Sequence, residues 1–267
     1  GDEETRKKVL SAVIKDIENA GRAESPAHAT THIHRTIREV IGGDPFREIK
    51  KQYNAIALSL YPRLKAQVLN SPDPLLTATR LAIAGNVIDF GIFTSVDIEG
   101  TIRRSLEARI EVDEYPAFKT AVESAGEILY LLDNAGEVVF DRLLIETLMK
   151  SGKKITAVAK GAPVINDCTL EEAEEAGLPC EVISNGSDAV GTILETTGED
   201  FRQRYMKAPL IISKGQGNFE TLLGAGALPP SHKVHPPKIF FLFQSKCDVV
   251  SRVLGLPKGS MLLVETR

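Results

Sequence analysis

Side chains of catalytic type follow four short apolar runs in the second half of the chain. They occupy the segments Asp133–Glu137, Lys160–Asp167, Lys214–Glu220 and Gln244–Lys246. If the apolar runs are parallel strands, their carboxyl ends share one edge of a sheet, and open α/β sheets bind ligands at that edge. Two carboxylates, two amides and three lysines then face one crevice, which is a set suited to holding a metal ion and a phosphoryl group.

The metal site is predicted from oxygen donors at two neighbouring strand ends. Asp133 and Asn134 offer adjacent hard oxygen ligands of the kind that Mg²⁺ or Mn²⁺ prefers. Asp167 follows Asp133 by 34 residues, about one βα unit, and is the natural third ligand. We therefore expect a divalent cation (Mn, Co, Ni or Mg) on Asp133, Asn134 and Asp167. The alternative is that Asp133 and Asp167 only terminate strands and cap the helices that follow.

The segment Lys214–Glu220 predicts a phosphate-binding turn. Gly215 and Gly217 leave backbone N–H groups unshielded just before a helix that is expected to begin near Asn218, and phosphates bind well at such helix N-termini. The spacing matches neither a Walker loop nor the dinucleotide-binding fingerprint. Lys160 and Lys246, each at a strand end, are predicted to neutralise phosphoryl charge, unless they are ordinary solvated lysines.

A further polar group, Asn86 to Asp89, ends an apolar helical run in the first half of the chain. It either stops that helix or reaches across to close the crevice from above. The loop Ser184–Asp188 is expected to shape the rim. No Ser-His-Asp or Cys-His set can be assembled from the remaining residues.

The elements that position these groups fall into two parts, 1–122 and 123–267. Residues 4 to about 120 are predicted to be helical, with helix starts at Ser25-Pro26, Asp44-Pro45 and Asp73-Pro74. From about 127, short β-rich runs alternate with helical stretches, and their nearly continuous apolar character fits strands buried on both faces. The predicted fold is α/β, a doubly wound, largely parallel (Rossmann-like) sheet with an N-terminal all-helical subdomain. The predicted strands are 127–132, 154–159, 180–184, 209–213, 238–243 and 260–265, and the predicted helices are 136–150, 169–176, 198–206, 218–224 and 246–254. The proline-rich stretch 225–237 is expected to be a loop that serves as a lid.

Composition excludes several classes of function. The chain has 267 residues, 43% of them hydrophobic, and a net charge of −4, so we expect no nucleic-acid partner. No apolar run reaches the roughly 18 residues that cross a bilayer, so we expect no membrane association. The three cysteines stand far apart, as in intracellular proteins, and a cytoplasmic location is expected. No feature of the sequence selects an oligomeric state.

Taken together, these motifs resemble the metal-dependent damage-control phosphatases, formerly the "domain of unknown function 89" family, close to the compact prokaryotic subgroup. The resemblance runs from about residue 50 to the C-terminus. It is carried by Gly85-Asn86-x-x-Asp89, Asp133-Asn134-Ala135-Gly136-Glu137, Lys160-x-x-Pro163-x-x-Asn166-Asp167, Lys214-Gly215-Gln216-Gly217-Asn218-Phe219-Glu220 and Lys246-Cys247.

The resemblance implies roles for individual residues. It places the divalent cation on Asp133, Asn134 and Asp167, with Lys246 beside them in catalysis. The substrate-facing residues that it implies are Glu137, Lys160, Lys214, Gly215, Gln216, Gly217, Asn218, Asn86 and Asp89. Larger eukaryotic relatives carry Arg-Thr-x-Lys where this chain has Phe243-Gln244-Ser245-Lys246, so the lysine is kept and the arginine is not. That difference removes the basis for assigning their phosphosugar preference to this chain.

The sequence thus predicts a metal-dependent phosphatase that hydrolyses a small phosphorylated metabolite. Either Asp133 or a metal-activated water attacks the phosphorus. Position 135 is alanine, whereas haloacid-dehalogenase-type enzymes have a second aspartate there, so we favour water, with Asp167 or Glu137 accepting its proton. Two alternatives are an S-adenosylmethionine-dependent methyltransferase and a non-catalytic phosphometabolite-binding protein.

Overall fold

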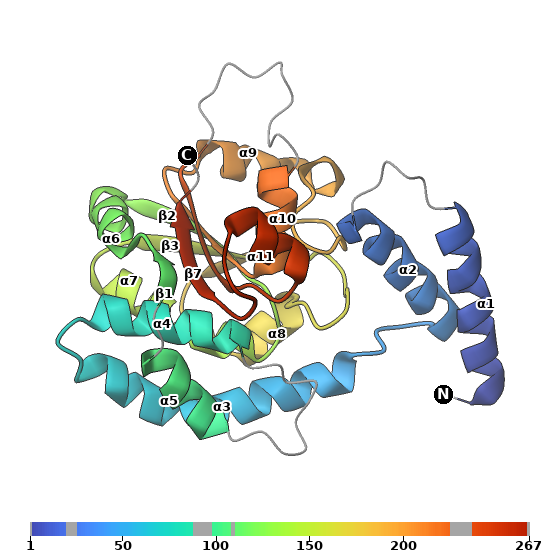
Figure 1. The fold of residues 1–267 in the computed structure, drawn as a ribbon, viewed down its shortest axis with the longest axis horizontal. Helices are drawn as coiled ribbons and strands as arrows, with labels where there is room; N and C mark the ends of the chain where they lie inside the picture. The colour runs from blue at the N-terminus through green and yellow to red at the C-terminus, as the bar shows by residue number, and fades with distance from the viewer. Residues whose placement is uncertain (1, 20–25, 88–97, 108–109, 225–236, 266–267) are drawn as a thin grey trace.

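The computed structural model describes residues 2–19, 26–87, 98–107, 110–224 and 237–265 (Figure 1). A seven-stranded sheet with the order β1-β7-β6-β5-β2-β3-β4 lies at its centre. The strands are β1 (Ile110–Asp113), β2 (Glu127–Leu131), β3 (Lys154–Ala159), β4 (Glu181–Ser184), β5 (Ile211–Lys214), β6 (Ile239–Gln244) and β7 (Met261–Glu265). All neighbours run parallel except β6 and β7. The predicted largely parallel sheet is confirmed.

Helices cover both faces of this sheet because its central strands are apolar on both sides. In β2, Ile128 and Tyr130 join a core with helices α3, α4, α6 and α7, whereas Leu129 and Leu131 pack with side chains of α9, α10 and α11. The described helices that follow β1 are α6 (Tyr115–Ser124), α7 (Glu137–Lys150), α8 (Leu170–Glu175), the short 3₁₀ turn η2 (Leu194–Thr196), α9 (Glu199–Lys207), α10 (Gln216–Gly224) and α11 (Asp248–Leu254). This two-sided cover is the predicted doubly wound arrangement.

The described residues before β1 form five helices. They are α1 (Glu3–Asn19), α2 (Pro26–Ile41), α3 (Arg47–Leu69), α4 (Pro74–Val87) and α5 (Ile98–Glu107). Helices α3 and α4 pack on α7, while α1 and α2 form a hairpin at the side of the molecule (Figure 1). Asp73 caps α4 as predicted, since its Oδ1 accepts a hydrogen bond of 3.0 Å from Leu76 N. Asp44 does not cap a helix: it accepts from Phe46 N at 2.8 Å in a turn, and α3 begins only at Arg47.

One segment of the first half differs from the helical expectation. Residues 110–113 form strand β1, which pairs with β7 at the edge of the sheet. The loop predicted at 225–237 lies, apart from Pro237, outside the described residues. In the part of the chain that is described, no helix combines the length and apolar character needed to cross a membrane.

Candidate active site

The strand order places a topological switch point between β2 and β5. The chain runs outward from β2 to β3 and β4, then returns to place β5 on the other side of β2. The loops that leave β2 and β5 therefore diverge, and ligands of open α/β sheets bind at such a switch point. Asp133 follows β2 and Gly215 follows β5, so two of the predicted clusters flank this switch point.

Backbone hydrogen bonds join the loop after β2 to the loop after β3. Cys168 N donates to Asp133 O at 2.8 Å, and Ala135 N donates to Asn166 O at 2.9 Å. Asn134 and Asp167 form an isolated antiparallel bridge between these bonds. The structure thus brings together the three residues that the sequence predicted as metal ligands.

Gly215 approaches the Asp133 side chain more closely than any other residue type could. Its φ is +82°, and a Cβ built on it would lie 2.0 Å from Asp133 Oδ2. Helix α10 then begins at Gln216, two residues earlier than predicted. Gly217 packs against the backbone of Gly191, whose own φ is +71°. The glycines therefore let the loop after β5 pack tightly against the carboxylate.

Amide side chains hold the acidic cluster together. Asn86 Nδ2 donates to Asp133 Oδ2 and to Glu137 Oε2, both at 3.0 Å, while Asn86 Oδ1 accepts from Gln244 N at 3.1 Å. Asn134 Nδ2 also donates to Asp133 Oδ2, at 2.8 Å. Asn86 thus reaches across from α4 to the sheet edge, as one of the two predicted interpretations required. Its companion Asp89 lies outside the described residues.

Lys214 is fully buried beneath this cluster. Its Nζ donates to Glu137 Oε1 and Asp141 Oδ1 at 2.6 Å each and to Ala82 O at 2.8 Å. Burial opposes its charge, but the attraction of Asp141 and Glu137 outweighs burial and raises the pKa of Lys214 above its usual value. All three ammonium protons are used by protein oxygens, which argues against the predicted direct contact with a substrate.

The other two predicted lysines differ in exposure. Lys160 is buried and donates to Ala189 O at 2.9 Å and to Gly191 O, and its Nζ lies 3.4 Å from Asp167 Oδ2. Lys246 is exposed, and its backbone N donates to Gln216 Oε1 at 2.6 Å. Of these lysines, Lys246 is the one that can meet a ligand from solvent.

Asn218 is also used internally. Its Oδ1 accepts from Thr192 Oγ1 at 2.7 Å, and its Nδ2 donates to Lys214 O at 2.8 Å and to Leu132 O at 3.3 Å. Because the side chain is 1% exposed, it ties β2, β5 and the 192 loop together, and no polar atom is left for the predicted substrate contact.

Electrostatics favour a cation at the cluster. Burial, followed by the charges of Glu137 and Asp167, raises the pKa of Asp133 well above its usual range, although Lys246 and Lys214 oppose the shift. Burial also raises the pKa of Asp167 against the attraction of Lys160. Like-charged carboxylates held this close require either a proton or a cation to be stable.

The donor set fits a hard divalent cation. Among the described residues, none donates a hydrogen bond to Oδ1 of Asp133 or to Oδ1 of Asp167, so within that part of the chain each aspartate has one oxygen without a donor. Within the described chain, no three His, Cys, Asp or Glu side chains are grouped to hold a metal. The predicted site instead combines two carboxylates with the amide of Asn134. A rotation of that amide by half a turn exchanges its oxygen and nitrogen, which presents the oxygen as a ligand.

Three supporting residues were not singled out from the sequence. Tyr130 donates to Asp141 Oδ1 at 2.9 Å, and Asn54 accepts from Gly136 N at 2.7 Å. The spacing of Glu137 and Asp141, four apart on a helix that is otherwise apolar on that side, is the signal that could have revealed a buried cation between them.

At the rim, Asp188 pairs with Arg35 and Arg38 of α2, which hold the pKa of its carboxyl down to about 2.

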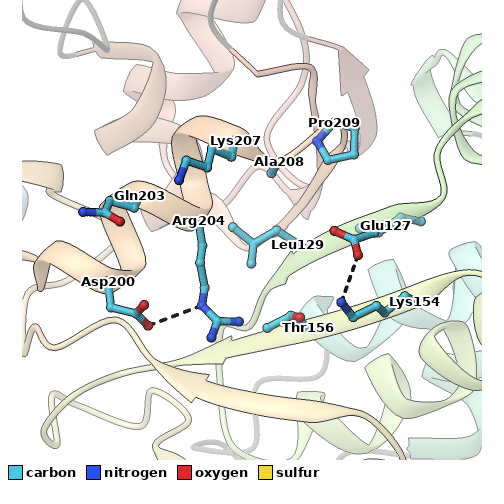
Figure 2. A pocket seen from close by; sticks show the side chains of 11 residues that line it. Glu127, Leu129, Lys154, Thr156, Asp200, Gln203, Arg204, Lys207, Ala208 and Pro209 are labelled. Carbon is cyan, nitrogen blue, oxygen red and sulfur yellow. Dashed lines mark hydrogen bonds and ion pairs between the residues drawn. The ribbon is translucent and has the colours of Figure 1, made fainter.

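A cavity of about 330 Å³ lies at the opposite, amino-terminal edge of the sheet (Figure 2). Glu127 and Lys154, the first residues of the neighbouring strands β2 and β3, pair at 2.9 Å on one side of it, and Arg204 pairs with Asp200 at 3.3 Å (Figure 2). None of the residues predicted to act in chemistry lines this cavity. The strand-end cluster is therefore the candidate active site.

The chain is similar to known proteins over nearly its whole length. Residues 1–262 match the family model described as "Damage-control phosphatase ARMT1-like domain". The chain is 33% identical to a "Damage-control phosphatase" of Archaeoglobus fulgidus, over 92% of this chain and 84% of that protein. It is 37% identical to an "Uncharacterized protein" of Methanocaldococcus jannaschii, over 95% and 83%. The crystal structure of a DUF89 family protein from Pyrococcus horikoshii is similar with a TM-score of 0.87 and 32% identity, over 100% of this chain and 91% of that one.

Proposed function

Because this chain belongs to the damage-control phosphatase ARMT1-like family, we propose that its strand-end cluster hydrolyses the phosphate monoester of a small metabolite with the aid of a divalent cation. The observation that carries the proposal is the meeting of Asp133, Asn134 and Asp167 at the switch point of the sheet, with Gly215 packed against Asp133. Oxygen donors and a close glycine turn together suit a cation and the phosphoryl group beside it.

The proposed role of each residue follows from whether its side chain is exposed or buried. Asp133, Asn134 and Asp167 would hold the cation, which when bound polarises a phosphoryl oxygen and acidifies water. Lys246, exposed at the end of β6, neutralises charge on the phosphoryl group. Lys214 and Lys160 act from behind, by holding Glu137 and Asp167 in place. Glu137 or Asp167 accepts the proton of the attacking water.

We propose water rather than Asp133 as the nucleophile. Asp133 Oδ2 is fixed by two amide donors, Asn86 and Asn134. Ala135 is fully buried and offers no acid to assist a leaving group. The haloacid-dehalogenase pattern places such an acid two residues after its nucleophilic aspartate, so its absence here supports direct attack by water.

The test is a screen of phosphorylated metabolites with the purified protein, first stripped by a chelator and then supplied with Mn²⁺, Co²⁺, Ni²⁺ or Mg²⁺. We expect turnover only with added cation and competitive inhibition by inorganic phosphate. Asp167→Ala should abolish turnover, whereas Asp167→Asn should retain weak cation binding because an amide oxygen still coordinates. Undiminished turnover after chelation contradicts the metal requirement.

The same screen separates the two alternatives. A phosphometabolite that binds in the presence of cation but is never hydrolysed indicates a binding protein. Saturable binding of S-adenosylmethionine without any effect of phosphate indicates a methyltransferase.

A further inference from the structure

Asn54 on α3 connects the two halves of the strand-end cluster. The first half is the Asp133–Asn134 segment after β2, and the second half is Asp167 after β3. Asn54 is 2% exposed. Its Oδ1 accepts from Gly136 N at 2.7 Å, and its Nδ2 donates to Glu172 O at 3.0 Å and to Glu175 Oε2 at 3.3 Å. One amide thus links the start of α7 to α8, and these helices follow the two strands that carry the site.

The Gly136 end of this link controls the first half of the site. Gly136 is the N-cap of α7, has a φ of +77° and provides no side-chain cap of its own. Asn54 supplies an acceptor from another helix, and it therefore fixes the peptide that stands between Asn134 and Glu137. A change in the tilt of that peptide would move both side chains.

The Glu172 end controls the second half. Glu172 Oε2 accepts from Thr169 N at 2.8 Å and from Thr169 Oγ1 at 2.6 Å, which closes a capping box two residues after Asp167. Lys50, one turn before Asn54 on the same face of α3, pairs with Glu172 Oε1 at 2.8 Å and is buried. Helix α3 therefore holds the start of α8 through two side chains.

The two halves also repel each other when both acids are ionised, because the charge of Asp167 opposes ionisation of Asp133. The direct links between them are the backbone bonds from Ala135 N to Asn166 O and from Cys168 N to Asp133 O. We propose that Asn54 is a positioning residue that keeps these two bonds closed and so sets the spacing between Asp133–Asn134 and Asp167. Only the consequence for cation binding and turnover rests on the function proposed above.

The first arm of the test needs no metal. Hydrogen exchange of the Ala135 and Cys168 amides is measured in the metal-free protein for Asn54→Ala and Asn54→Asp. Losing the bridge should speed exchange at both amides by about tenfold or more in Asn54→Ala, the scale of one lost hydrogen bond. Asn54→Asp retains the acceptor for Gly136 N but loses the donor to Glu172 O, so it should protect Gly136 while Cys168 still exchanges fast.

Leu64→Ala is the matched control, because Leu64 is buried on the same helix and far along it from the cluster. It lowers global stability but should leave the exchange of Ala135 and Cys168 unchanged relative to the rest of the core. If Asn54→Ala speeds these two amides no more than Leu64→Ala does, the effect is general destabilisation and the positioning role is wrong.

The second arm measures the dissociation constant of Mn²⁺ by calorimetry. Both Asn54 variants should bind Mn²⁺ about 10–100-fold more weakly, as variants of outer-shell residues do, and kcat should fall more than KM rises. Leu64→Ala should bind Mn²⁺ like the wild type. Unchanged Mn²⁺ affinity in Asn54→Ala overturns the proposal. If the wild type itself binds no Mn²⁺, the proposed function fails, and the exchange arm alone decides the role of Asn54.

Discussion

Charged residues meet at both ends of the central strands, but in different ways. At the amino-terminal edge, Lys154 and Glu127 pair at 2.9 Å with side chains that are 70% and 63% exposed. At the carboxyl-terminal edge, Lys214 pairs at 2.6 Å with Glu137 and Asp141, and all three side chains are at most 1% exposed. An exposed pair contributes little stability, whereas burying a pair costs desolvation energy that its attraction rarely recovers.

The carboxyl-terminal edge is therefore where this fold bears an energetic cost. The charges of the amino-terminal edge are solvated and already paired, so changes to these pairs should alter stability little. The carboxyl-terminal edge keeps a surplus of acid, with Asp133, Glu137, Asp141 and Asp167 gathered near two buried lysines. Such a surplus is what the cation proposed above would balance.

Variants at the two edges of the sheet are expected to differ most in turnover. Asp133→Ala removes a proposed cation ligand and should lower kcat by about 10³-fold or more, the scale of losing several kcal/mol of charge stabilisation. Asp200→Ala, at the amino-terminal cavity, removes an exposed partner of Arg204 and should leave kcat unchanged. Steady-state kinetics with saturating Mn²⁺ measures both. Equal losses in the two variants would mean that the edges do not differ in function.

The next contrast concerns stability. Lys214→Met leaves Glu137 and Asp141 buried without their counter-ion, and the free energy of unfolding should fall by about 3–5 kcal/mol. Lys154→Met breaks a solvated pair and should cost about 1 kcal/mol or less. Urea denaturation followed by circular dichroism gives both values. A small loss in Lys214→Met would show that the buried network is not held by charge.

Two glycines separate backbone strain from a collision at the site. Gly215 and Gly152 have φ values of +82° and +83°, but among described atoms a Cβ at Gly152 meets nothing within 4 Å. Gly152→Ala should therefore cost only the left-handed penalty of about 1–2 kcal/mol. Gly215→Ala should cost more and also abolish turnover, because the methyl group displaces the Asp133 carboxylate. Normal activity in Gly215→Ala would refute the packing described here.

The mildest contrast is a pH dependence. Burial raises the pKa of Asp141 to about 7 although Lys214 opposes it, and the unfolded chain titrates near about 4. Between these values the folded protein holds a proton that the unfolded chain has released, so stability from this group falls as pH rises, by at most about 1.4 kcal/mol per pH unit. Asp141 Oδ2 has no partner among the described residues, so Asp141→Asn is nearly isosteric. Denaturation from pH 4 to 7 should show the wild type losing stability relative to Asp141→Asn; parallel curves would contradict the shift.

The sequence predicted best those elements of the fold that depend on residues close together in the chain. The apolar runs at 154–159 and 238–243 predicted β3 and β6 to within a residue, because strands buried on both faces are nearly continuous apolar runs. Asp73 predicted its helix start because a cap acts over three residues. Strand β1, Ile-Glu-Val-Asp, was missed because its pairing depends on β7, far away in the sequence.

The site shows the same division between local and distant information. Parallel strand ends correctly predicted that Asp133, Asn134 and Asp167 would meet. The depth of Lys214 was not predictable in the same way, since a lysine that ends a strand can point to solvent or beneath the neighbouring helix. Asn54 carried no local signal at all, because its importance comes from two loops that only the folded chain brings to α3.

The position of β7 between β1 and β6 has a consequence for how the molecule is made. Ile110 pairs with Met261, so β1 has no neighbour in the sheet until residues 261–265 have been synthesised. Contacts so distant along the chain form slowly, and an unpaired strand edge invites association with other chains while it waits. During translation the inner strands can assemble first, and the edge that joins the first half of the protein to its last strand is completed only after synthesis has passed β7.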